Sequence, residues 1–522
     1  MPGPYDTYTS PLATRNASPE MLRLWSARHK FNTWRRIWLA AAEAMHEVTR
    51  GDAAPLVRKE QVEELRSVVE RGITDEEIAK AEEYERELRH DVMAHVHALG
   101  DSCPKARAII HLGMTSQDVV CNADLQIVED AAWMIEAKIV RVVIALAEGA
   151  ARWARLPTLA FTHYQPAQPT TVGRRLAQHA DELLLCRHRL YSPLDRAGFC
   201  RRGLRGATGT QAAFLALFDG DSDRVDAFEQ DAMLRLGGSD GIDPSLPDEA
   251  LGSIARALAS SRTFRLTGQT YPRVVDCFIL SDLAAVAAVL HKIATDIRLL
   301  SNRKEIDEPF EHGQVGSSAM PYKRNPMRCE RICGLTRFVM NLVGNAYDTA
   351  ATQWLERTLD DSSNRRLSLP EAFLALDGAL DLMHNVASGL VVHEAMVRRN
   401  LTAELPFLAT ENILMACVKL GGDRQDYHER IRVHAQAAGM RVKQEGLEND
   451  LLDRLRADPA FRSKARGGML DGEIDWDGLM DPMKYVGRSV EQTERFIREV
   501  VEPLREQYAE AIARLGESGP RV

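Results

Sequence analysis

The pattern of apolar and polar positions along the chain predicts helices and gives little sign of strands. Apolar residues recur at three- and four-residue spacing through residues 20–48, which is the period of an amphipathic helix. Residues 277–290 are nearly all apolar, interrupted by Ser281 and Asp282. A helix that is apolar on most sides is buried among other helices. Further long helices are predicted over residues 124–154, 171–191, 277–301, 327–356 and 370–391.

Several long apolar helices in one region predict an all-α protein built around a central long-helix bundle. We expect other subunits to complete its core, because helices this long and apolar need more covering than the flanking regions supply; a large single-chain bundle is the alternative. The connections between the helices are polar and rich in Gly, Pro and Thr. They hold most of the unusual residue combinations, as expected when a rigid scaffold presents functional loops. They are residues 111–118, 162–173, 203–211, 301–326 and 357–369.

Length and composition narrow the class of protein. A chain of 522 residues is too long for one core, and its 45% hydrophobic and 27% charged residues are ordinary for a water-soluble protein. The net charge of −9 argues against general nucleic-acid binding. No uncharged apolar run approaches the roughly 20 residues of a membrane helix, and the N-terminus lacks a signal pattern. The eight cysteines show no Cys-x-x-Cys pair, so we expect free thiols and a cytoplasmic location, with no membrane association.

Residues 316–332 carry the strongest chemical signal. Gly316 and Ser317 open a small, flexible, hydroxyl-bearing loop, and the cationic residues Lys323 and Arg324 follow. Asn325 is predicted to cap a helix, with Pro326 at its first position, where a missing N–H costs nothing. A loop that runs into a positive helix N-terminus suits an anion whose charge grows during a reaction. Further cations in the first helical turns are Arg328 and Arg331.

Two polar segments in the first quarter of the chain are candidates for substrate contact. Residues 89–97 contain three histidines, but their spacing fits a zinc site poorly and lacks a His-Glu-x-x-His pattern. A structural helix with polar caps is the alternative there. Residues 111–118 place a glycine turn before Thr115, Ser116 and an acid, which locally predicts an ordinary helix start. A helix N-terminus with two hydroxyl donors also suits a carboxylate ligand.

Two later segments suggest acid–base chemistry and anion binding. His163 lies in a proline-bounded stretch, Thr-His-Tyr-Gln-Pro, and histidine is the usual acid–base group near neutral pH. Residues 353–366 alternate arginines with hydroxyls after a long helix. Charge clusters are usually solvated surface, yet Arg357, Arg365 and Arg366 would make a good phosphate or carboxylate clamp. Residues 206–211 lack the Lys-Ser/Thr continuation and the βαβ context of a phosphate-binding P-loop, which rejects that interpretation.

The string Gly-Ser-Ser-Ala-Met-Pro-Tyr-Lys-Arg-Asn-Pro-Met-Arg closely resembles the signature loop of the fumarase/aspartase superfamily, and its second half resembles adenylosuccinate lyases. The resemblance spans nearly the whole chain, from residues 10–15 to residues 404–407 and 421–426. It implies three helical domains, with boundaries that we place at residues 1–115, 116–392 and 393–522. It also implies a homotetramer whose active sites combine segments of three subunits, with no metal or organic cofactor.

The resemblance implies cleavage of adenylosuccinate to AMP and fumarate, and of the succinocarboxamide ribonucleotide of purine biosynthesis to its carboxamide and fumarate. Ser317 is the candidate base and His163 the candidate acid, which fits a β-elimination that expels nitrogen. Asn16 stands where close relatives often carry Tyr, so a ring is replaced by an amide. By resemblance the substrate contacts are Arg15, Asn16, Arg89, His90, Asp91, Thr115, Ser116, Gln269, Lys323, Asn325, Arg331, Arg357, Ser362 and Arg366.

Two alternative functions share part of this pattern. An argininosuccinate lyase would share the scaffold and the Gly-Ser-Ser loop, but its substrate lacks phosphate. The arginine cluster at 357–366 argues against that function. A catalytically inactive helical scaffold is the second alternative, and the joint presence of His163, Ser317 and Lys323 argues against it.

Overall fold

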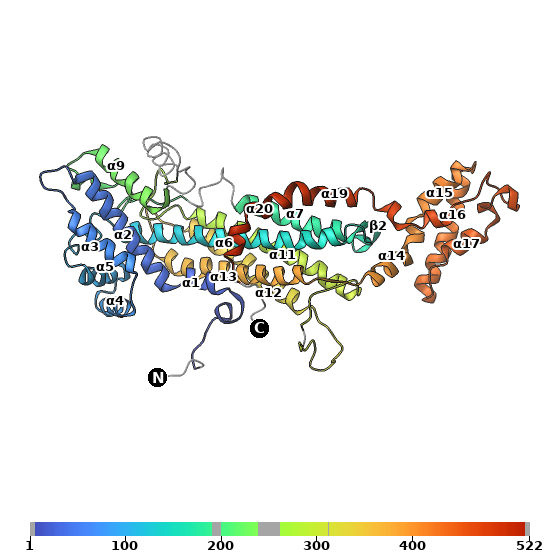
Figure 1. Ribbon diagram of the computed structural model, residues 1–522, viewed down its shortest axis with the longest axis horizontal. Coiled ribbons are helices and arrows are strands. Elements are labelled where there is room, and N and C mark those ends of the chain that lie inside the picture. The colour runs from blue at the N-terminus through green and yellow to red at the C-terminus, as the bar shows by residue number, and fades with distance from the viewer. Residues whose placement is uncertain (1–5, 191–199, 239–261, 312, 517–522) are drawn as a thin grey trace.

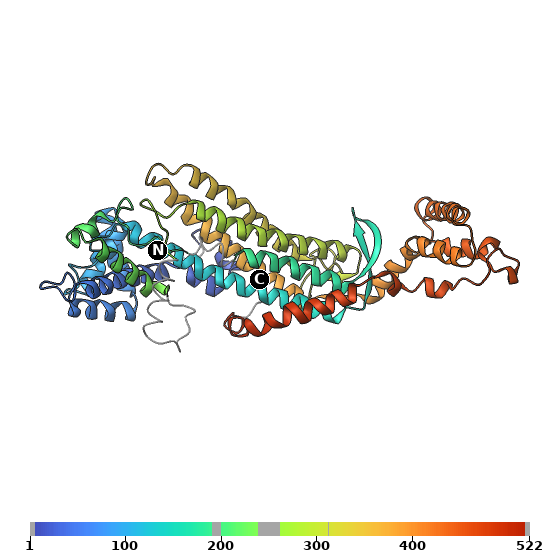
Figure 2. The ribbon, with the colours of Figure 1, turned by 90° about the horizontal axis from the view of Figure 1, so that it is seen from above.

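The computed structural model describes residues 6–190, 200–238, 262–311 and 313–516. Over these residues the chain is elongated and largely helical, with a bundle in the middle and a group of shorter helices at each end (Figures 1 and 2). The predicted all-α fold class is confirmed. Buried apolar side chains form three clusters, one in the bundle and one in each end region. The domain boundaries near residues 115 and 392 stay a prediction.

The first end region begins with a helix that the sequence pattern predicted as one unit over residues 20–48. The structure divides it between Leu24 and Ala27. Ser26 has extended backbone, and its side chain accepts a hydrogen bond from the amide of His29 at 3.2 Å. A serine in this position caps a new helix, so the apolar spacing continues across a break. The elements are η1 (Leu12–Asn16), α1 (Pro19–Leu24), α2 (Ala27–Thr49), α3 (Lys59–Arg71), α4 (Asp75–Leu88) and α5 (Asp91–Ser102).

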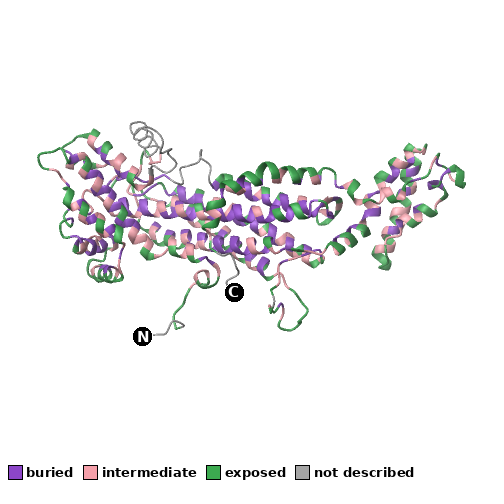
Figure 3. Ribbon diagram, viewed as in Figure 1, coloured by how far each residue is buried: buried purple, intermediate pink, exposed green. Residues whose placement is uncertain are grey.

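Five long helices form the central bundle and pack side by side in both views (Figures 1 and 2). Most of the buried residues lie there (Figure 3). The longest helix, α6, has 37 residues, which corresponds to a length of about 55 Å. The bundle helices are α6 (Ser116–Arg152), α7 (Val172–Leu190), α11 (Val274–Asn302), α12 (Met327–Ala351) and α13 (Asp360–Ser388).

The junction between α12 and α13 differs from the prediction. α12 ends at Ala351, before the predicted end at residue 356, and α13 begins at Asp360 rather than at residue 370. Asp360 and Asp361 occupy the first turn of α13, where carboxylates interact favourably with the positive end of the helix dipole. Residues 360–369, predicted as part of a loop, are therefore helical. This assignment places part of the arginine cluster on a rigid element.

The segment 162–173, predicted as an irregular connection, is mostly a β-hairpin. β1 (Pro157–Thr162) pairs antiparallel with β2 (Gln165–Thr171). The two turn residues, His163 and Tyr164, have φ angles of 54° and 57°. A type I′ hairpin turn requires positive φ at both positions, which residues other than glycine seldom adopt. A second small sheet joins β3 (Ile306–Asp307) to β4 (Val391–Val392).

Two segments pack onto regions that lie far from them in sequence. Residues 204–236 contribute apolar side chains to the first end region, where α9 lies beside α2 (Figure 1). The last helices return to the bundle, where Tyr508 donates a hydrogen bond to Glu136 at 2.5 Å. The remaining elements are α8 (Ala212–Leu217), α9 (Ser222–Met233), η3 (Leu234–Gly238), α14 (Glu394–Leu408), α15 (Thr410–Lys419), α16 (Arg424–Met440), η4 (Arg441–Glu445), α17 (Leu451–Ala457), η5 (Pro459–Phe461), η6 (Lys464–Arg466), α18 (Trp476–Leu479), η7 (Pro482–Tyr485), α19 (Ser489–Phe496), η8 (Ile497–Val501), α20 (Glu502–Gln507) and α21 (Ala509–Ala513).

α11 leaves part of its apolar surface uncovered. Among the described residues, α11 is the only individual helix that is long and apolar enough to cross a membrane. α14 and α15 together are also long and apolar enough, but a bend of 48° separates them. Half of the apolar window of α11 is buried inside the bundle. Val274, Phe278 and Leu299 remain 44%, 48% and 38% exposed, and at 100° per residue they share one face. An exposed apolar stripe of this kind marks an interaction surface.

Candidate active site

One group of the predicted site residues meets where the first end region joins the bundle. His90 precedes α5, and its Nδ1 accepts a hydrogen bond from the amide of Met93 at 3.3 Å. Its Nε2 lies 3.3 Å from Oγ of Ser116, the first residue of α6. Asp91 forms an ion pair with Arg366 of α13 at 3.0 Å. Three segments that are far apart in the sequence therefore supply neighbouring polar groups.

A second set of predicted residues lies around Arg357, just before α13. Arg357 donates from Nη1 to the side-chain oxygen of Gln269 at 2.9 Å and from Nη2 to Oγ of Ser362 at 3.0 Å. The amide of Gln269 donates to the carbonyl of Glu356 at 3.1 Å, which fixes the two segments to each other. The nearest carboxylate, of Asp361, is 3.6 Å away. Arg357 thus makes its shortest contacts with neutral groups.

A small pocket of about 240 Å³ opens beside these groups, and Ser362 and Arg366 belong to its lining. Lys30 also lines this pocket, over the rings of Phe31 and Trp34 at 4.7 and 5.3 Å. Burial, and then the charge of Arg366, lowers the pKa of Lys30. Lys30 was not predicted as a site residue. The sequence feature that could have indicated it is a lysine next to an aromatic residue within the apolar-periodic segment 20–48.

The histidines that follow His90 lie apart from this group. His95 is buried against Phe31, with ring centroids 3.8 Å apart, and burial together with Arg35 lowers the pKa of His95 to about 4. His97 lies 5.3 Å from the ring of Tyr84. Nowhere in the described ranges do three metal-binding side chains come together. Arg89 ends α4 in the left-handed region, with φ of 55°, and its side chain is exposed.

Two of the cations predicted for anion binding are instead part of the folded scaffold. Arg365 is buried, pairs with Asp276 at 2.6 Å and also reaches Asp124 at 3.1 Å. Arg328 is buried too, and pairs with Glu311 at 2.6 Å. Arg365 and Arg366 differ in burial because they are consecutive residues of one helix. Consecutive residues point about 100° apart, so Arg365 is buried in the bundle while Arg366 stays 62% exposed, although both line the pocket.

The Gly-Ser-Ser loop projects from the bundle and is largely exposed (Figures 1 and 3). Gly316 packs against the loop's other limb, since a Cβ added to it would lie 2.2 Å from the carbonyl oxygen of Lys323. Asn325 donates to the carbonyl of Gly316 at 3.0 Å and closes the base of the loop. Ser317 is half-buried, and its Oγ accepts a hydrogen bond from the amide of Met320 at 3.2 Å.

The predicted helix cap after this loop was wrong. α12 begins at Met327, with Pro326 rather than Asn325 in the N-cap position. The amides of Arg328 and Cys329 donate to the two carboxylate oxygens of Glu308, both at 3.0 Å. Because Glu308 already neutralises this helix N-terminus, the terminus is not open to a substrate anion. Asn325 is free to hold the loop instead.

The candidate acid lies far from the first group within one chain. His163 is exposed at the tip of the hairpin that follows α6, whereas His90 contacts the residue that begins α6. These ends of α6 are separated by about 55 Å, and Figure 1 shows α5 and β2 at opposite ends of the bundle. The turn conformation of His163 and Tyr164 is strained for these residue types, which is a common property of functional sites. A single chain does not gather all the predicted groups.

A third group comes from the N-terminal segment and α12. Burial, and then the nearby charge of Arg15, lowers the pKa of Arg331. η1 lies against α13, where a Cβ added to Gly378 would come within 2.7 Å of the carbonyl oxygen of Asn16. The Asn16 amide donates to the carbonyl of Pro11 at 2.9 Å. The close backbone contact fixes Arg15 on the side of the bundle.

Comparison with known proteins identifies the family. The profile described as "Adenylosuccinate lyase C-terminus" matches residues 406–496, and the profile described as "Lyase" matches residues 13–214 and 269–341. The adenylosuccinate lyase of Saccharomyces cerevisiae is 45% identical over 497 residues, which are 95% of each chain. That of Schistosoma mansoni is 41% identical over 98% of each chain. The chain belongs to the adenylosuccinate lyase family.

Members of this family are lyases, and the chain is accordingly a fumarate-releasing lyase of purine biosynthesis. Solved structures show the same fold. A 3-carboxy-cis,cis-muconate lactonizing enzyme from Pseudomonas putida superposes with a TM-score of 0.72 at 24% identity, over 95% of this chain and 99% of the other. A fumarate lyase from Mesorhizobium sp. BNC1 also reaches 0.72, at 20% identity, over 94% and 99%.

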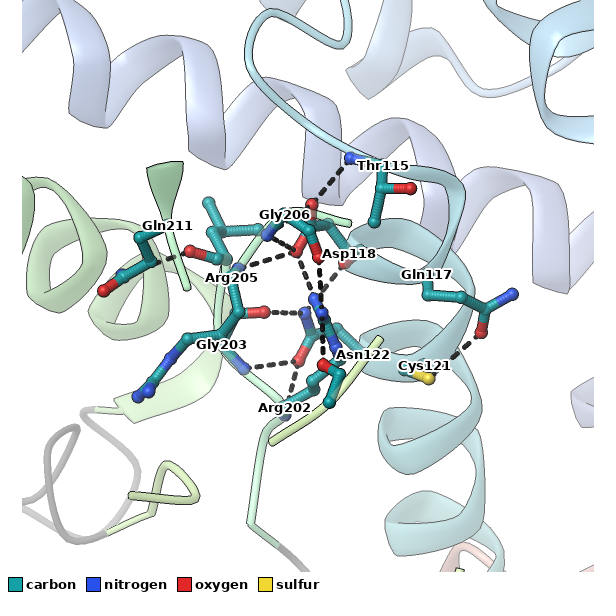
Figure 4. A network of polar contacts seen from close by, with 12 residues as sticks. Thr115, Gln117, Asp118, Cys121, Asn122, Arg202, Gly203, Arg205, Gly206 and Gln211 are labelled. Carbon is teal, nitrogen blue, oxygen red and sulfur yellow. Dashed lines mark hydrogen bonds and ion pairs between the residues drawn. The ribbon is translucent and has the colours of Figure 1, made fainter. Parts of the chain in front are cut away.

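A buried polar network beneath this lyase's first group holds Thr115 in place (Figure 4). The carboxylate of Asp118 accepts hydrogen bonds from the amides of Thr115 and Arg205, both at 2.7 Å, and is paired with Arg202. Arg202 also donates to the carbonyl of Gly268 at 2.9 Å, one residue before Gln269. The acid at position 118 was predicted as part of a helix start. Arg202 was not predicted, because no local sequence pattern shows that this arginine pairs with a distant carboxylate.

Asp118→Asn is expected to destabilise the folded enzyme strongly. Both Asp118 and Arg202 are 0% exposed, and removing one partner of a buried ion pair costs about 3–5 kcal/mol. The thermal midpoint, followed by circular dichroism, should fall by several degrees. Asp426→Asn is the matched control, since its pair with Arg430 is partly exposed and is worth less than about 1 kcal/mol. Equal midpoints for the two variants would contradict a structural role for the network.

Proposed function

We propose that this chain cleaves adenylosuccinate to AMP and fumarate, and cleaves the succinocarboxamide ribonucleotide of purine biosynthesis by the same chemistry. The observation that most supports this is the meeting of Arg357, Ser362 and Arg366 with His90 and Ser116. The substrate brings a phosphate and two carboxylates. A protein with a net charge of −9 needs its cations concentrated locally to bind such a ligand, and arginine can donate two parallel hydrogen bonds to each anionic group.

The proposed reaction is a β-elimination with two protein groups. Ser317 takes the proton from the succinyl carbon next to a carboxylate, and the electron pair forms the double bond of fumarate. The bond between the neighbouring carbon and the purine-side nitrogen breaks, and His163 gives its proton to that nitrogen. Lys323 stabilises the negative charge that builds on the carboxylate. No metal or organic cofactor takes part in the proposed steps.

A serine base requires a lowered pKa in the reacting complex. The amide of Met320, which donates to Oγ of Ser317, would also stabilise the alkoxide. Lys323 is exposed in the present loop conformation, so we propose that the loop closes over the substrate and brings this charge to Ser317. Closure would also remove water, which strengthens each interaction in the site. The exposed loop and its pinned base, Gly316 with Asn325, allow that movement.

The other predicted contacts follow the family motif position by position and form part of the proposal. The phosphate side is assigned to the arginines, and the succinyl side to the small polar residues. The proposed phosphate-side residues are Arg15, Arg357, Ser362 and Arg366, with Arg331 and Asn16 nearby. The proposed succinyl-side residues are Thr115, Ser116, Gln269, Lys323 and Asn325, with Arg89, His90 and Asp91 at the same cluster.

We further propose a homotetramer with active sites shared between subunits, in the cytoplasm. Two observations support the assembly. The apolar face of α11 formed by Val274, Phe278 and Leu299 is uncovered in the single chain. The candidate acid His163 lies about 55 Å along the bundle from His90, so only another copy can supply the missing group.

Mixing two inactive variants tests the sharing of sites. His163→Ala and Ser317→Ala proteins, exchanged into hybrid assemblies, are expected to recover part of the wild-type activity, because some sites then receive both intact groups. The measurement is turnover of adenylosuccinate before and after subunit exchange. The control is each variant exchanged with itself, which should recover nothing. Hybrid assemblies that are demonstrated by mass spectrometry and yet stay inactive would contradict shared sites.

A substrate assay separates the proposed function from its two alternatives. The purified enzyme should release fumarate from adenylosuccinate, observed as a change in ultraviolet absorbance. An argininosuccinate lyase would instead consume argininosuccinate and leave adenylosuccinate unchanged. An inactive scaffold would consume neither. The Arg357 cluster favours the first result, since argininosuccinate carries no phosphate for it to bind.

A further inference from the structure

A second cavity lies between the bundle and the hairpin that carries His163, and Leu299 of the exposed α11 face also lines it. It has a volume of about 520 Å³ and is formed by β1, β2, α7, α11 and α19. That size falls in the range of small-molecule sites, roughly 300–1,000 Å³. Phe161 and Tyr164 lie on either side of His163 in the hairpin and line this cavity. We call it the hairpin pocket.

The lining of the hairpin pocket has an excess of positive charge. It contains four cationic side chains and one carboxylate, Asp296, which leaves a net charge of +3. The buried His179 adds no charge, because burial, with Lys292 and Arg175, lowers the pKa of His179 to about 3. Such a concentration of charge on an acidic protein favours an anionic ligand. The cations are Arg174, Arg175, Lys292 and Arg303.

Neighbouring acids pair with some of these cations and leave others free to bind. Arg303 pairs with Glu305 at 3.1 Å, and Lys292 lies 3.2 Å from Asp296 and 3.4 Å from Glu182. Among the described residues Arg174 and Arg175 form no salt bridge, although the charges of Glu305 and Asp296 act on Arg175. The donors on those two arginines are therefore the ones that a ligand would engage first.

One nitrogen of the Arg175 guanidinium, at the wall of the hairpin pocket, lacks a hydrogen-bond partner among the described residues. Its Nη2 donates to the carbonyl of Leu159 at 2.8 Å. Its Nη1 is buried and has no hydrogen-bond partner within the described part of the chain. Burying a charged donor without a partner costs free energy. Because Arg175 lines the pocket, a small rotation of its guanidinium would bring this donor to a ligand oxygen. Nearby, Arg174 donates from Nε to the side-chain oxygen of Gln492 at 2.8 Å and from Nη1 to that of Gln178 at 3.5 Å, and both partners are neutral.

We propose that the hairpin pocket binds a small anion of the phosphate class. Phosphate presents several acceptor oxygens and no strong donor, which matches a lining of guanidinium and ammonium groups. The occupant would lie against Tyr164 and brace the turn that carries His163. The site belongs to the same chain as that hairpin, and it is separate from the phosphate clamp around Arg357 and Arg366.

Hydrogen–deuterium exchange with inorganic phosphate as the probe tests this proposal on the assembled enzyme. Amides of the hairpin, residues 157–171, and of the end of α11, residues 292–302, should exchange more slowly when phosphate is present. At ten times the dissociation constant, exchange through local opening should slow about tenfold. Phosphate in the proposed active site would protect residues 357–366 and also slow exchange at the turn that carries His163, so protection of residues 292–302 distinguishes the two sites.

The variant Arg174→Gln/Lys292→Gln should lose the protection of residues 292–302 and keep that of residues 357–366. Arg155→Gln/Lys419→Gln is the matched control. It removes the same charge at exposed positions outside the pocket and should keep both effects. Equal protection of residues 292–302 in the pocket variant would overturn the proposal. Protection confined to residues 357–366 and the turn that carries His163 in the wild type would overturn it as well, since phosphate would then bind only at the active site.

Discussion

Ser317→Ala is expected to lower kcat by about 10²- to 10⁴-fold, the range for loss of a positioned general base. The hydroxyl lies half-buried in the loop, where it accepts a hydrogen bond from the amide of Met320, and the close contact of Gly316 with Lys323 holds the base of the loop together. Alanine fits the same backbone, so helical content and assembly should stay unchanged. The measurement is the turnover of adenylosuccinate at saturating concentration, with circular dichroism and light scattering on the same preparation.

Ser318→Ala is the control for this result, because Ser318 is the adjacent hydroxyl and is exposed. We expect a much smaller loss in that variant. If Ser318→Ala fell as far as Ser317→Ala, the effect would belong to the loop as a whole and not to one base. Near-normal turnover by Ser317→Ala would remove Ser317 from the mechanism.

Arg366→Leu is expected to raise KM for adenylosuccinate. The side chain is 62% exposed and reaches Asp91 at 3.0 Å, so a bound anion can engage its remaining donors. One lost charge-assisted contact is worth about 1.5–3 kcal/mol, which corresponds to roughly 10- to 150-fold in kcat/KM. Steady-state kinetics would measure it. For a substrate without the phosphate, the decrease in kcat/KM should be much smaller, because Arg366 is proposed to contact the phosphate.

Arg398→Leu makes the same substitution at the same exposure, 61%, on a helix outside the site. Its kinetics should match those of the wild type. Unchanged kinetics in a folded Arg366→Leu enzyme would show that the phosphate is bound elsewhere. An equal decrease in kcat/KM for substrates with and without the phosphate would indicate that Arg366 contacts another part of the substrate.

The sequence predicted the helical bundle well because long apolar runs at helical spacing have few other solutions. The helix over 277–301 corresponds to α11, and the helix start at Ser116 was found from its capping pattern. Local errors arose where two local preferences compete. Asn325 can cap a helix, but the carboxylate of Glu308 accepts the hydrogen bonds of the first helical amides instead. A hairpin turn at His163 and Tyr164 could not be foreseen, because neither residue favours positive φ.

The sequence predicted which residues belong to the candidate site but not how these residues are arranged in space. Motif resemblance named His90, Ser317 and His163 without showing how far apart one chain holds them. The sequence also could not separate Arg365 from Arg366, because the register of α13 relative to its neighbours decides which one is buried. Arg202 and Lys30 were missed for a similar reason, since each acts through partners that only the folded chain brings near.

The length of α6 sets a spacing that evolution cannot change freely. In the proposed assembly each chain gives His90 and Ser116 to one centre and His163 to another, and α6 lies between them. Inserting one residue into a helix moves everything beyond it by about 1.5 Å and turns it by about 100°. An insertion in α6 would therefore disturb every centre of the assembly at once. Variation in chain length is expected to accumulate in the surface connections, where it leaves this spacing untouched.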